Sequence, residues 1–451
     1  MANTYLQRTL GTPTSAYKGT LSWWQKGAST NTTYYVLACE SGSERFLWYV
    51  SSGAFGGGLR GTSSPPDIDF SLSGTPKFRD VSGWYNFVLA WDSTQSTASD
   101  RIKFYVNNVQ YAVSSSGTSG VNDIPLNHVM PMNKSGLPFR LGSNITGGNY
   151  FTGLMSHIHL IDGIAYDATA FGETDANGVW KIKTSPSVTY GNNGAFILKD
   201  GNSVTDQSGN SNNFTVGGGT LTKTEDSPSN VFATWNPLYK SSGTVTFSNG
   251  NTKIVGVDYS NQRTGGTLAA KSGKFYFEIK TQGSVSFGGS AIGIADYDSI
   301  NISGSTSFVG NDSNFIGYYG SGTLRVSNGS SYNDYATLSV GDIIGFAFDI
   351  DNGFAYFSVN GVWQNSGDPT SGATGTGNVN RSGNLNYNFA GKLMGLAGGF
   401  QSTDSPIANF GNGYFGTTAV SSAGTNASGI GIFEYDVPTG YTALSTKGLN
   451  L

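Results

Sequence analysis

The stretch GDIIGFAFDIDNGFAYFSVNGVW, residues 341–363, decides the fold class of this chain. Its apolar side chains recur with a period of two, the period at which a β-strand alternates its faces. Residues 351–353 (Asp-Asn-Gly) and 360–361 (Asn-Gly) tolerate positive φ, as two-residue hairpin loops require. The stretch is therefore predicted to be a β-meander whose side chains serve packing. The large residues expected on one packed face are Ile344, Phe346, Phe348 and Ile350.

The amino-acid composition favours an all-β chain with long polar loops. Only 12% of the residues are charged, against a typical ~25%. Glycine makes up 65 of the 451 residues, which is about twice its usual share. Helix surfaces are usually rich in Lys, Glu and Arg, whereas many short strands and turns use Gly, Ser, Thr and Asn. A chain of this length is long enough for two or three domains.

Charge and cysteine content exclude several classes of protein. The formal net charge of −4 provides no basic field, so we expect no nucleic-acid partner. Cys39 is the only cysteine, which excludes an internal disulfide and a Cys-based metal site. We expect neither a secretion signal nor membrane insertion, because MANTYLQRTLGTPTS has no apolar core and no apolar run reaches ~18 residues.

A weakly charged, aromatic-rich β protein without disulfides or an export signal fits a virion component. Such a protein is made in the reducing host cytoplasm and released by lysis, so it needs neither feature. A cytosolic sandwich protein and a product of leaderless secretion remain as alternatives.

Strand-like runs separated by Gly-, Ser- and Asn-rich turns extend along both halves of the chain, as is typical of β-sandwiches. The polar segment 200–230 is the best domain boundary on composition. We predict a first sandwich over 1–190, a linker and chain entry over 191–240, and a second sandwich over 241–416. A C-terminal tail over 417–451 is expected to pack back or to join a neighbour.

A short internal echo links the two halves. FYVNNVQ (104–110) and FSVNGVW (357–363) share the pattern Phe-x-Val-Asn-[Asn/Gly]-Val-x, and each follows a pair of strand-like runs. Two copies suggest that both domains use similar jelly-roll sandwiches, although a pattern this short also arises by coincidence.

The first region resembles a laminin-G-like sandwich of the concanavalin-A type. WYNFVLAWDSTQSTASDRIKFYVNNVQ (84–110) has that family's order of an aromatic pair, a strand that reaches an Asp, a loop, and a strand that ends in an Asn turn. LMSHIHLIDGIAYD (154–167) stands in the matching late position. The second region resembles a SPRY domain through KFYFEIKTQG (274–283), AIGIADYD (291–298) and the meander. Together these resemblances cover roughly residues 1–170 and 240–412.

The whole arrangement also resembles structural proteins of tailed bacteriophages, especially marine ones. This resemblance implies a particle component, such as a tail fibre, an appendage or a capsid-surface decoration. The stretches that carry it are ANTYLQRTLGT (2–12), FGETDANGVW (171–180), DQSGNSNNFTV (206–216), DSPSNVFATWNPL (226–238) and VPTGYTALSTKGLNL (437–451).

The leading candidate for a binding site lies in the turn-rich run 326–342. The SPRY resemblance implies binding through loops at one edge of the sandwich, and tyrosine offers stackable area with a polar tip at low entropic cost. The alternative is that these tyrosines pack on their own domain, and the sequence supports both equally. The candidate residues are Tyr332, Asn333, Asp334 and Tyr335, together with Trp363.

Trp23 and Trp24 are expected on opposite faces of one strand, so that one indole belongs to the core. The other indole is expected to pack in the core or an interface in preference to binding a sugar. His157 and His159 have a spacing that can bind zinc, but only His128 accompanies them, and a polar sheet face is the preferred interpretation.

A glycoside hydrolase of this fold would need carboxylates at alternate positions of one strand. The nearest strings are Glu434-Tyr-Asp436 and Asp349-Ile-Asp351, and neither has a third acid at the required spacing, so turn roles are preferred. Calcium stays open as a cofactor, because some laminin-G-like domains bind it through Asp side chains. The conceivable ligands are Asp92, Asp162 and Asp167.

We therefore predict an all-β chain of two jelly-roll, concanavalin-A-like sandwiches in tandem, with a turn-rich linker and a short tail. Its predicted function is that of a non-enzymatic virion protein that displays these domains for binding to a host surface or to particle proteins. We expect a homo-oligomer in contact with other virion proteins, and a host glycan or protein as the external partner. The alternatives are a glycan-binding lectin, a glycoside hydrolase of concanavalin-A-like fold, and a purely architectural cement protein.

Overall fold

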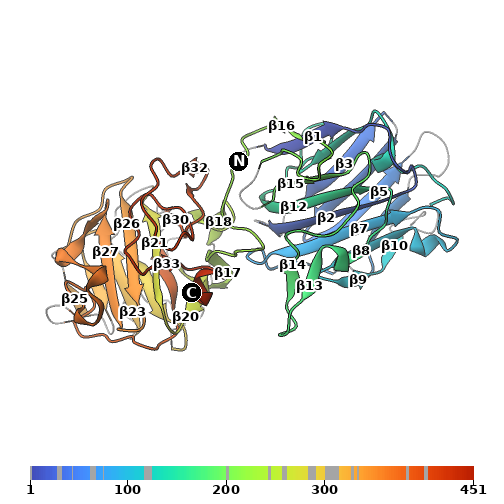
Figure 1. Ribbon diagram of the computed structural model, residues 1–451. Coiled ribbons are helices and arrows are strands. Elements are labelled where there is room, and N and C mark those ends of the chain that lie inside the picture. The colour runs from blue at the N-terminus through green and yellow to red at the C-terminus, as the bar shows by residue number, and fades with distance from the viewer. Residues whose placement is uncertain are drawn as a thin grey trace. The chain divides into compact units, whose positions relative to one another are not determined.

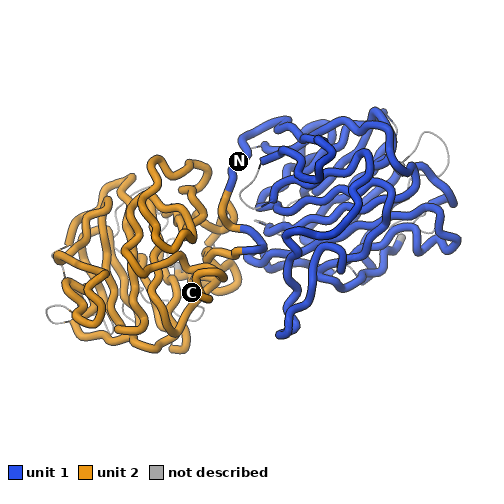
Figure 2. Tube along the Cα trace, in the orientation of Figure 1, with its two compact units in different colours: residues 1–223, 227–229 blue, residues 224–226, 230–451 orange. Residues whose placement is uncertain are grey.

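The chain forms two compact units, residues 1–223 with 227–229 and residues 224–226 with 230–451 (Figure 2). The computed structural model describes residues 3–27, 33–42, 44–60, 68–74, 76–115, 124–199, 203–241, 245–255, 262–282, 291–299, 314–326, 330–332, 335–381, 385–400 and 405–451. None of the short 3₁₀ helices in this described part of the chain has the length and hydrophobicity of a membrane span.

The first unit is a sandwich of an eight-stranded and a six-stranded sheet (Figure 1). The larger sheet has the order β10 (Val113–Ser115), β6 (Ile68–Leu72), β5 (Ala54–Arg60), β4 (Glu44–Ser51), β3 (Tyr34–Ser41), β11 (Pro138–Leu141), β1 (Tyr5–Thr9) and β16 (Thr215–Gly218). The smaller sheet has the order β15 (Ala195–Ile197), β12 (Gly153–Asp162), β2 (Lys18–Gly27), β7 (Tyr85–Asp92), β8 (Ile102–Val106) and β9 (Val109–Tyr111). The remaining elements are the hairpin β13 (Gly172–Thr174) and β14 (Trp180–Ile182), and the 3₁₀ helices η1 (Ala98–Asp100), η3 (Pro131–Asn133) and η4 (Ala168–Ala170).

The second unit is also built from two large sheets. One has the order β17 (Trp235–Lys240), β20 (Gln262–Ala270), β29 (Met394–Phe400), β22 (Ala291–Asp296), β23 (Phe315–Tyr319), β24 (Leu324–Val326) and β25 (Ser330–Tyr332). The other has the order β18 (Thr246–Ser248), β19 (Lys253–Val255), β30 (Ile407–Asn409), β21 (Lys274–Lys280), β26 (Ile343–Asp349), β27 (Phe354–Val359) and β28 (Val362–Trp363), with β33 (Thr442–Ala443) also paired to β21. The remaining elements are β31 (Tyr414–Phe415), β32 (Thr418–Ala419), η5 (Gln364–Ser366), η6 (Pro369–Thr374) and η7 (Gly448–Asn450).

Each unit has its own hydrophobic core between its two sheets. In the first unit the Trp48 ring of β4 lies 4.6 Å from the Phe104 ring of β8, across the layers. In the second unit the Tyr318 ring of β23 lies 5.5 Å from the Phe357 ring of β27, also across the layers. The predicted all-β sandwich class is therefore confirmed.

The two copies of the echoed pattern form the same kind of two-residue hairpin, β8–β9 and β27–β28. The two central residues of each turn have positive φ, as the turn requires. They are Asn107 (46°) and Asn108 (69°) in the first unit, and Asn360 (49°) and Gly361 (79°) in the second. The β-meander is thus confirmed, and its second turn has the predicted two-residue length.

The first turn of the meander is longer than the predicted two-residue loop. Asp349 pairs with Phe354, which leaves residues 350–353 between the strands, and of these only Gly353 has positive φ (70°). The Asp349 carboxylate accepts hydrogen bonds from the backbone N–H of Asn352 at 3.0 Å and from its Nδ2 at 2.8 Å. These hydrogen bonds to the Asp349 carboxylate close a four-residue loop in place of the predicted two-residue loop.

The segment predicted as a linker, residues 191–240, is largely built into the two units. Its strands β15 and β16 pair with β12 and β1 of the first unit, whereas β17 pairs with β20 of the second. The Asp206 carboxylate accepts the backbone N–H groups of Phe196 and Asn212, each at 2.8 Å. The Asn212 amide in turn donates to the Gly194 carbonyl at 2.7 Å. The DQSGNSNN run is therefore a hydrogen-bonded closure of the first unit.

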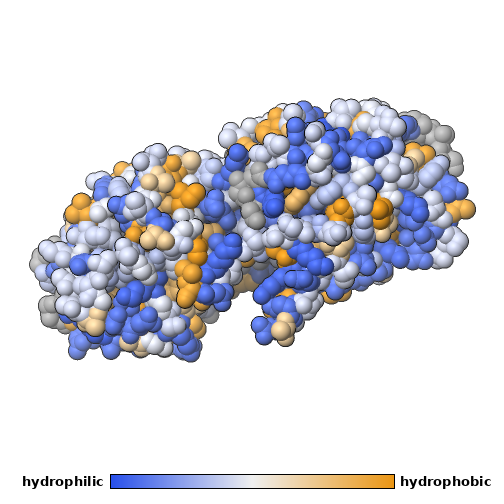
Figure 3. All heavy atoms as spheres, viewed as in Figure 1, coloured by the Kyte–Doolittle hydropathy of each residue, from blue (hydrophilic) through white to orange (hydrophobic). Residues whose placement is uncertain are grey.

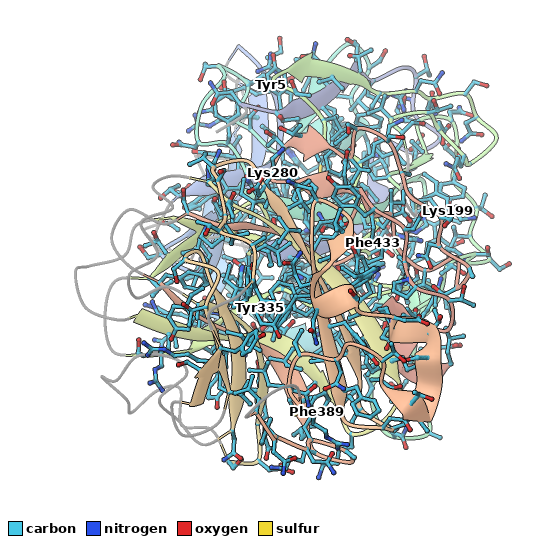
Figure 4. The ribbon with its side chains drawn as sticks, turned by 90° about the vertical axis from the view of Figure 1, so that its left-hand side faces the viewer. Tyr5, Lys199, Lys280, Tyr335, Phe389 and Phe433 are labelled. Atoms are coloured by element: carbon cyan, nitrogen blue, oxygen red, sulfur yellow. The ribbon has the colours of Figure 1, made fainter. Side chains whose placement is uncertain are left out.

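The C-terminal residues 417–451 pack back onto the second unit, one of the two outcomes expected from the sequence. β33 runs parallel to β21 and pairs with it. The Phe433 ring, labelled in Figure 4, lies 5.0 Å from the Tyr276 ring of β21. Phe433 and Tyr441 are both 1% exposed, so this segment contributes to the unit's own core.

Candidate functional site

The predicted loop site in the second unit is partly buried. Tyr335, labelled in Figure 4, is only 8% exposed, and its ring lies 6.3 Å from the Tyr318 ring. Tyr332 is half-buried, and its ring lies 5.2 Å from that of Tyr335. Tyr335 thus takes the packing role, whereas part of the Tyr332 ring stays at the surface. Asn333 and Asp334 lie outside the described residues.

Trp363 does not stand free beside these tyrosines. It is half-buried on β28, with its ring 6.4 Å from the Tyr276 ring and its side chain against the second unit's core. Its neighbour Val362 is strongly exposed. The surface left by the predicted residues is therefore the outer part of Tyr332 and the edge strand β28.

Both adjacent tryptophans of β2 are buried. Trp23 faces the core, where its ring stacks 5.4 Å from that of Phe87. Trp24 points to the other face and is also buried. The chain beyond β12 covers that face, because Trp180 of β14 donates a hydrogen bond from Nε1 to Oδ1 of Asn86, the register partner of Trp24, at 3.2 Å. Packing is thus the role of both indoles.

His157 and His159 lie at a β-bulge, where His157 has a φ of 47°. They form no exposed polar face, since both are buried. The His159 ring stacks 4.1 Å from the Phe196 ring, and its Nδ1 lies 2.9 Å from the Tyr190 hydroxyl. Burial lowers the pKa of His159 well below its usual value. The described residues contain no group of three His, Cys, Asp or Glu side chains placed to hold a metal ion.

The three aspartates considered for calcium each accept hydrogen bonds in their own loops. The Asp162 carboxylate accepts the backbone N–H groups of Thr14 at 2.6 Å and Asn193 at 3.0 Å. Asp92 and Asp167 each accept the backbone N–H two residues ahead, at 3.0 Å and 2.9 Å. Each of these carboxylates therefore serves as a hydrogen-bond acceptor that closes a loop.

The acids considered for glycoside hydrolysis also hold turns. The Asp349 carboxylate lies 2.9 Å from Lys274 Nζ, and the Asp351 carboxylate accepts the Gly273 N–H at 2.8 Å. In the C-terminal segment, Glu434 accepts the Ser421 N–H at 2.8 Å and Asp436 accepts the Thr425 N–H at 2.6 Å. All four side chains therefore hold turns, which is the role preferred from the sequence.

Glu278 is a buried acid that the sequence reasoning missed. It lies in the middle of β21 and is 0% exposed. Its carboxylate accepts the backbone N–H groups of Glu434 at 2.9 Å and Tyr435 at 2.8 Å, the Asn409 amide at 3.2 Å and the Tyr276 hydroxyl at 3.1 Å. Burial raises the pKa of Glu278 to about 7, although the four hydrogen bonds act to lower it. This carboxyl ties the C-terminal segment to the sheet, and the signal for it was an acid inside the apolar run KFYFEIK.

A second surface that the sequence reasoning missed is the outward side of the first unit's eight-stranded sheet. On strand β4, Phe46, Trp48 and Val50 are buried in the core, whereas Arg45, Leu47 and Tyr49 lie on the other side, where Leu47 is buried and Arg45 and Tyr49 are half-buried. We call this surface the tyrosine face. It consists of the half-buried residues Tyr35, Glu40, Arg45, Tyr49, Asp69 and Arg140.

The centre of the tyrosine face is the ring of Tyr49, which lies down on the neighbouring strand. Its register partner on β5 is Gly56, and a Cβ built there would come within 3.0 Å of the Tyr49 ring. The missing side chain therefore lets the ring lie against the sheet. Tyr35, the register partner on β3, has its ring 5.5 Å away at 45°. Partial burial, then the nearby charge of Asp69, and then Tyr35 raise the pKa of Tyr49.

Two arginines share this side of the sheet with the rings. Arg140 on β11 is held 4.4 Å above the Tyr5 ring, and its Nη1 donates to the Asn144 carbonyl at 3.2 Å. Arg45 lies on β4 at the other end of the face, opposite Glu40. Tyrosine and arginine are among the residue types enriched at the energetic centres of binding surfaces. Their arrangement on one sheet face makes this the best-formed candidate binding site among the described residues.

No protein-family model matches this sequence, and no curated relative matches it. Solved structures match in part. The SPRY domain of human HERC1 is 12% identical over 39% of this chain and 96% of that one, with a TM-score of 0.28. The heptameric SAP-like pentraxin from Limulus polyphemus is 18% identical over 37% of this chain and 72% of that one, with a TM-score of 0.26. The TRIM65 PSpry domain is 13% identical over 39% and 89%, with a TM-score of 0.27. At this level of likeness, no ligand or activity carries over.

Proposed function

We propose that this chain is a non-enzymatic virion protein, a fibre, appendage or capsid-surface component, that displays two rigid sandwiches for binding. Its ligand would lie on the host surface or on another particle protein. The observation that carries the binding role is the tyrosine face, where the Tyr49 ring lies against Gly56 and shares one side of the sheet with Arg45 and Arg140.

The tyrosine face is suited to binding because its side chains are already largely held in place before a ligand binds. The Tyr49 ring is confined by Gly56 below it, and Arg140 is confined by the Tyr5 ring and a carbonyl. Side chains that are already held in place lose less entropy when a partner binds. Elsewhere, hydrophobic residues on the visible surface are scattered among polar ones (Figure 3), as on an ordinary protein surface.

The virion assignment is supported by the resemblance of several sequence stretches to those of phage structural proteins. Two of these stretches serve the stability of the first unit. Residues 171–180 supply β13 and the start of the hairpin that covers the outer side of β2, and residues 206–213 form the hydrogen-bonded closure around Asp206. Such closures suit a protein that must keep its shape outside the cell.

We also expect the protein to assemble as a homo-oligomer. Within the described residues, β9 and β16 end their sheets, and an edge strand presents backbone groups that another chain can pair with. Light scattering after size exclusion of the full chain would give the mass of the assembly. A monomer at micromolar concentration would contradict this expectation.

Two experiments test the proposed function. Mass spectrometry of gradient-purified phage particles should find the chain in the particle fraction, and its presence only in the soluble lysate would refute the virion assignment. The full chain should also bind susceptible cells, with the double variant Tyr35→Ala/Tyr49→Ala losing this binding. Tyr332→Ala is the matched control in the second unit, and a loss with this variant alone would move the binding site there.

A further inference from the structure

We infer that the tyrosine face binds a neutral polysaccharide, with a sugar ring packed on Tyr49. This inference rests on the proposed function, because it names the ligand class of the same surface. It depends on three features of the face: the partly exposed Tyr49 ring, the presence of both signs of charge, and the small amount of apolar area around it.

The Tyr49 ring provides the packing platform. Its outer end lies against β5 at Gly56, and the residue is half-buried, so part of the ring remains at the surface. The C–H side of a pyranose ring is apolar and packs on such a surface, while the phenol keeps a polar tip beside it. The Tyr35 ring, 5.5 Å away and tilted by 45°, forms a wall on one side of the platform.

The described side chains of the face carry both signs of charge. Among its described side chains, Arg45 and Arg140 are matched in number by Glu40 and Asp69. Guanidinium groups donate hydrogen bonds and carboxylates accept them. Together they can therefore donate hydrogen bonds to sugar hydroxyls and accept hydrogen bonds from them. A face that carries both signs of charge favours a neutral ligand over a strongly acidic or basic one.

The spacing of these groups suits an extended ligand. Arg45 and Tyr49 lie four positions apart on the same strand, a separation of about 13 Å at the usual rise per residue. Arg140 lies two strands away from β4, about 10 Å across the sheet. A polymer of several linked sugars can therefore contact both guanidinium groups and the ring at once.

A second copy of this chain is a poorer occupant of the face. The large aliphatic residue on the outward side of β4 is Leu47, and it is only 9% exposed, so it adds little apolar area to an interface. The face also lies in the middle of the sheet, where β3 and β5 already satisfy the backbone of β4. It offers neither the apolar core of a stable dimer nor an edge for strand addition.

Affinity electrophoresis and calorimetry of the full chain test this inference, with laminarin and dextran as neutral probes and alginate as the acidic probe. We expect binding to a neutral glucan, a loss of about tenfold or more with Tyr49→Ala, and near-complete retention with Tyr49→Phe, which keeps the ring. Gly56→Ala should weaken binding as well, because its new Cβ would push the ring off the sheet. Tyr332→Ala should leave binding unchanged.

The outcomes separate the ligand class from the proposed function. Binding to alginate in preference to both glucans would overturn the neutral class. If no polysaccharide binds but the Tyr35→Ala/Tyr49→Ala variant still loses attachment to cells, the sugar inference fails and the binding role of the face stands. If attachment to cells is unaffected by that variant, the role of the face fails. Equal binding by Tyr49→Ala and wild type would place a glucan site elsewhere and would also overturn the inference.

Discussion

Replacing Glu278 with Gln should remove a pH dependence from the stability of the second unit. Burial raises the pKa of this carboxyl from its ordinary value of 4.5 to about 7. Between these two values the folded protein binds more protons than the unfolded chain. The stabilisation from this group is therefore fully present below pH 4.5 and is lost as the pH rises through about 7.

The size of the effect follows from the two pKa values. For a shift from 4.5 to about 7, linkage gives a loss of about 2.5 kcal/mol in the free energy of unfolding between pH 5 and pH 8. In a unit of this size, 1 kcal/mol moves the midpoint by roughly 2–4 °C. The wild-type transition should therefore fall by roughly 5–10 °C over this range on account of Glu278 alone.

Scanning calorimetry of the full chain, at steps from pH 5 to pH 8, measures this effect. The other titrating groups are common to wild type and Glu278→Gln, so the difference between their midpoints isolates the contribution of this carboxyl. Glu225→Gln, an exposed acid of the same unit, is the matched control and should follow wild type. A difference that stays constant with pH would refute the reasoning. It would mean that the four donors keep the carboxylate ionised throughout.

Gly57→Ala should destabilise the first unit by about 2–4 kcal/mol, because a Cβ there would lie 2.3 Å from the Phe70 ring. Gly27→Ala, whose Cβ has 3.7 Å of space, should stay within about 0.5 kcal/mol of wild type, and equal effects in denaturant unfolding would contradict the packing. Asp162→Ala should cost about 2–4 kcal/mol, since buried donors lose their acceptor. Chelation by EGTA should leave the wild-type midpoint unchanged, and a lower midpoint would reveal a bound calcium ion. Cys39 should react with a thiol reagent only on unfolding, because it is buried and burial raises its pKa; fast reaction of the folded protein would count against this.

Much of the fold could be predicted because the deciding signals are local. The alternation in residues 341–350 depends only on the two-residue period of a strand, and the turn at Asn360 depends only on which residues tolerate positive φ. The first turn differed because the Asp349 side chain captured the backbone of Asn352. A side-chain contact of this kind competes with the turn preference of the same residues.

The candidate binding site could not be predicted in the same way. Tyr35, Tyr49 and Asp69 come from three strands, and they meet only because the sheet order places β3, β4, β5 and β6 side by side in one register. No spacing in the sequence encodes that register. The tyrosines of residues 326–342 were predicted to form a site because they lie close together in the sequence. In the structure, Tyr335 is instead buried in its own unit and packs on Tyr318.

The sequence by itself determined that the chain is all-β, that it has two sandwiches, and where the meander runs, because these depend on period, composition and turn residues. Only the tertiary structure decided which polar and aromatic side chains are buried and which share a face. It buried Trp24, His159 and Glu278, and it laid the Tyr49 ring on Gly56. The physical reason is that burial and cross-strand contact depend on residues distant in sequence, which are brought together only when the sheets form and stack.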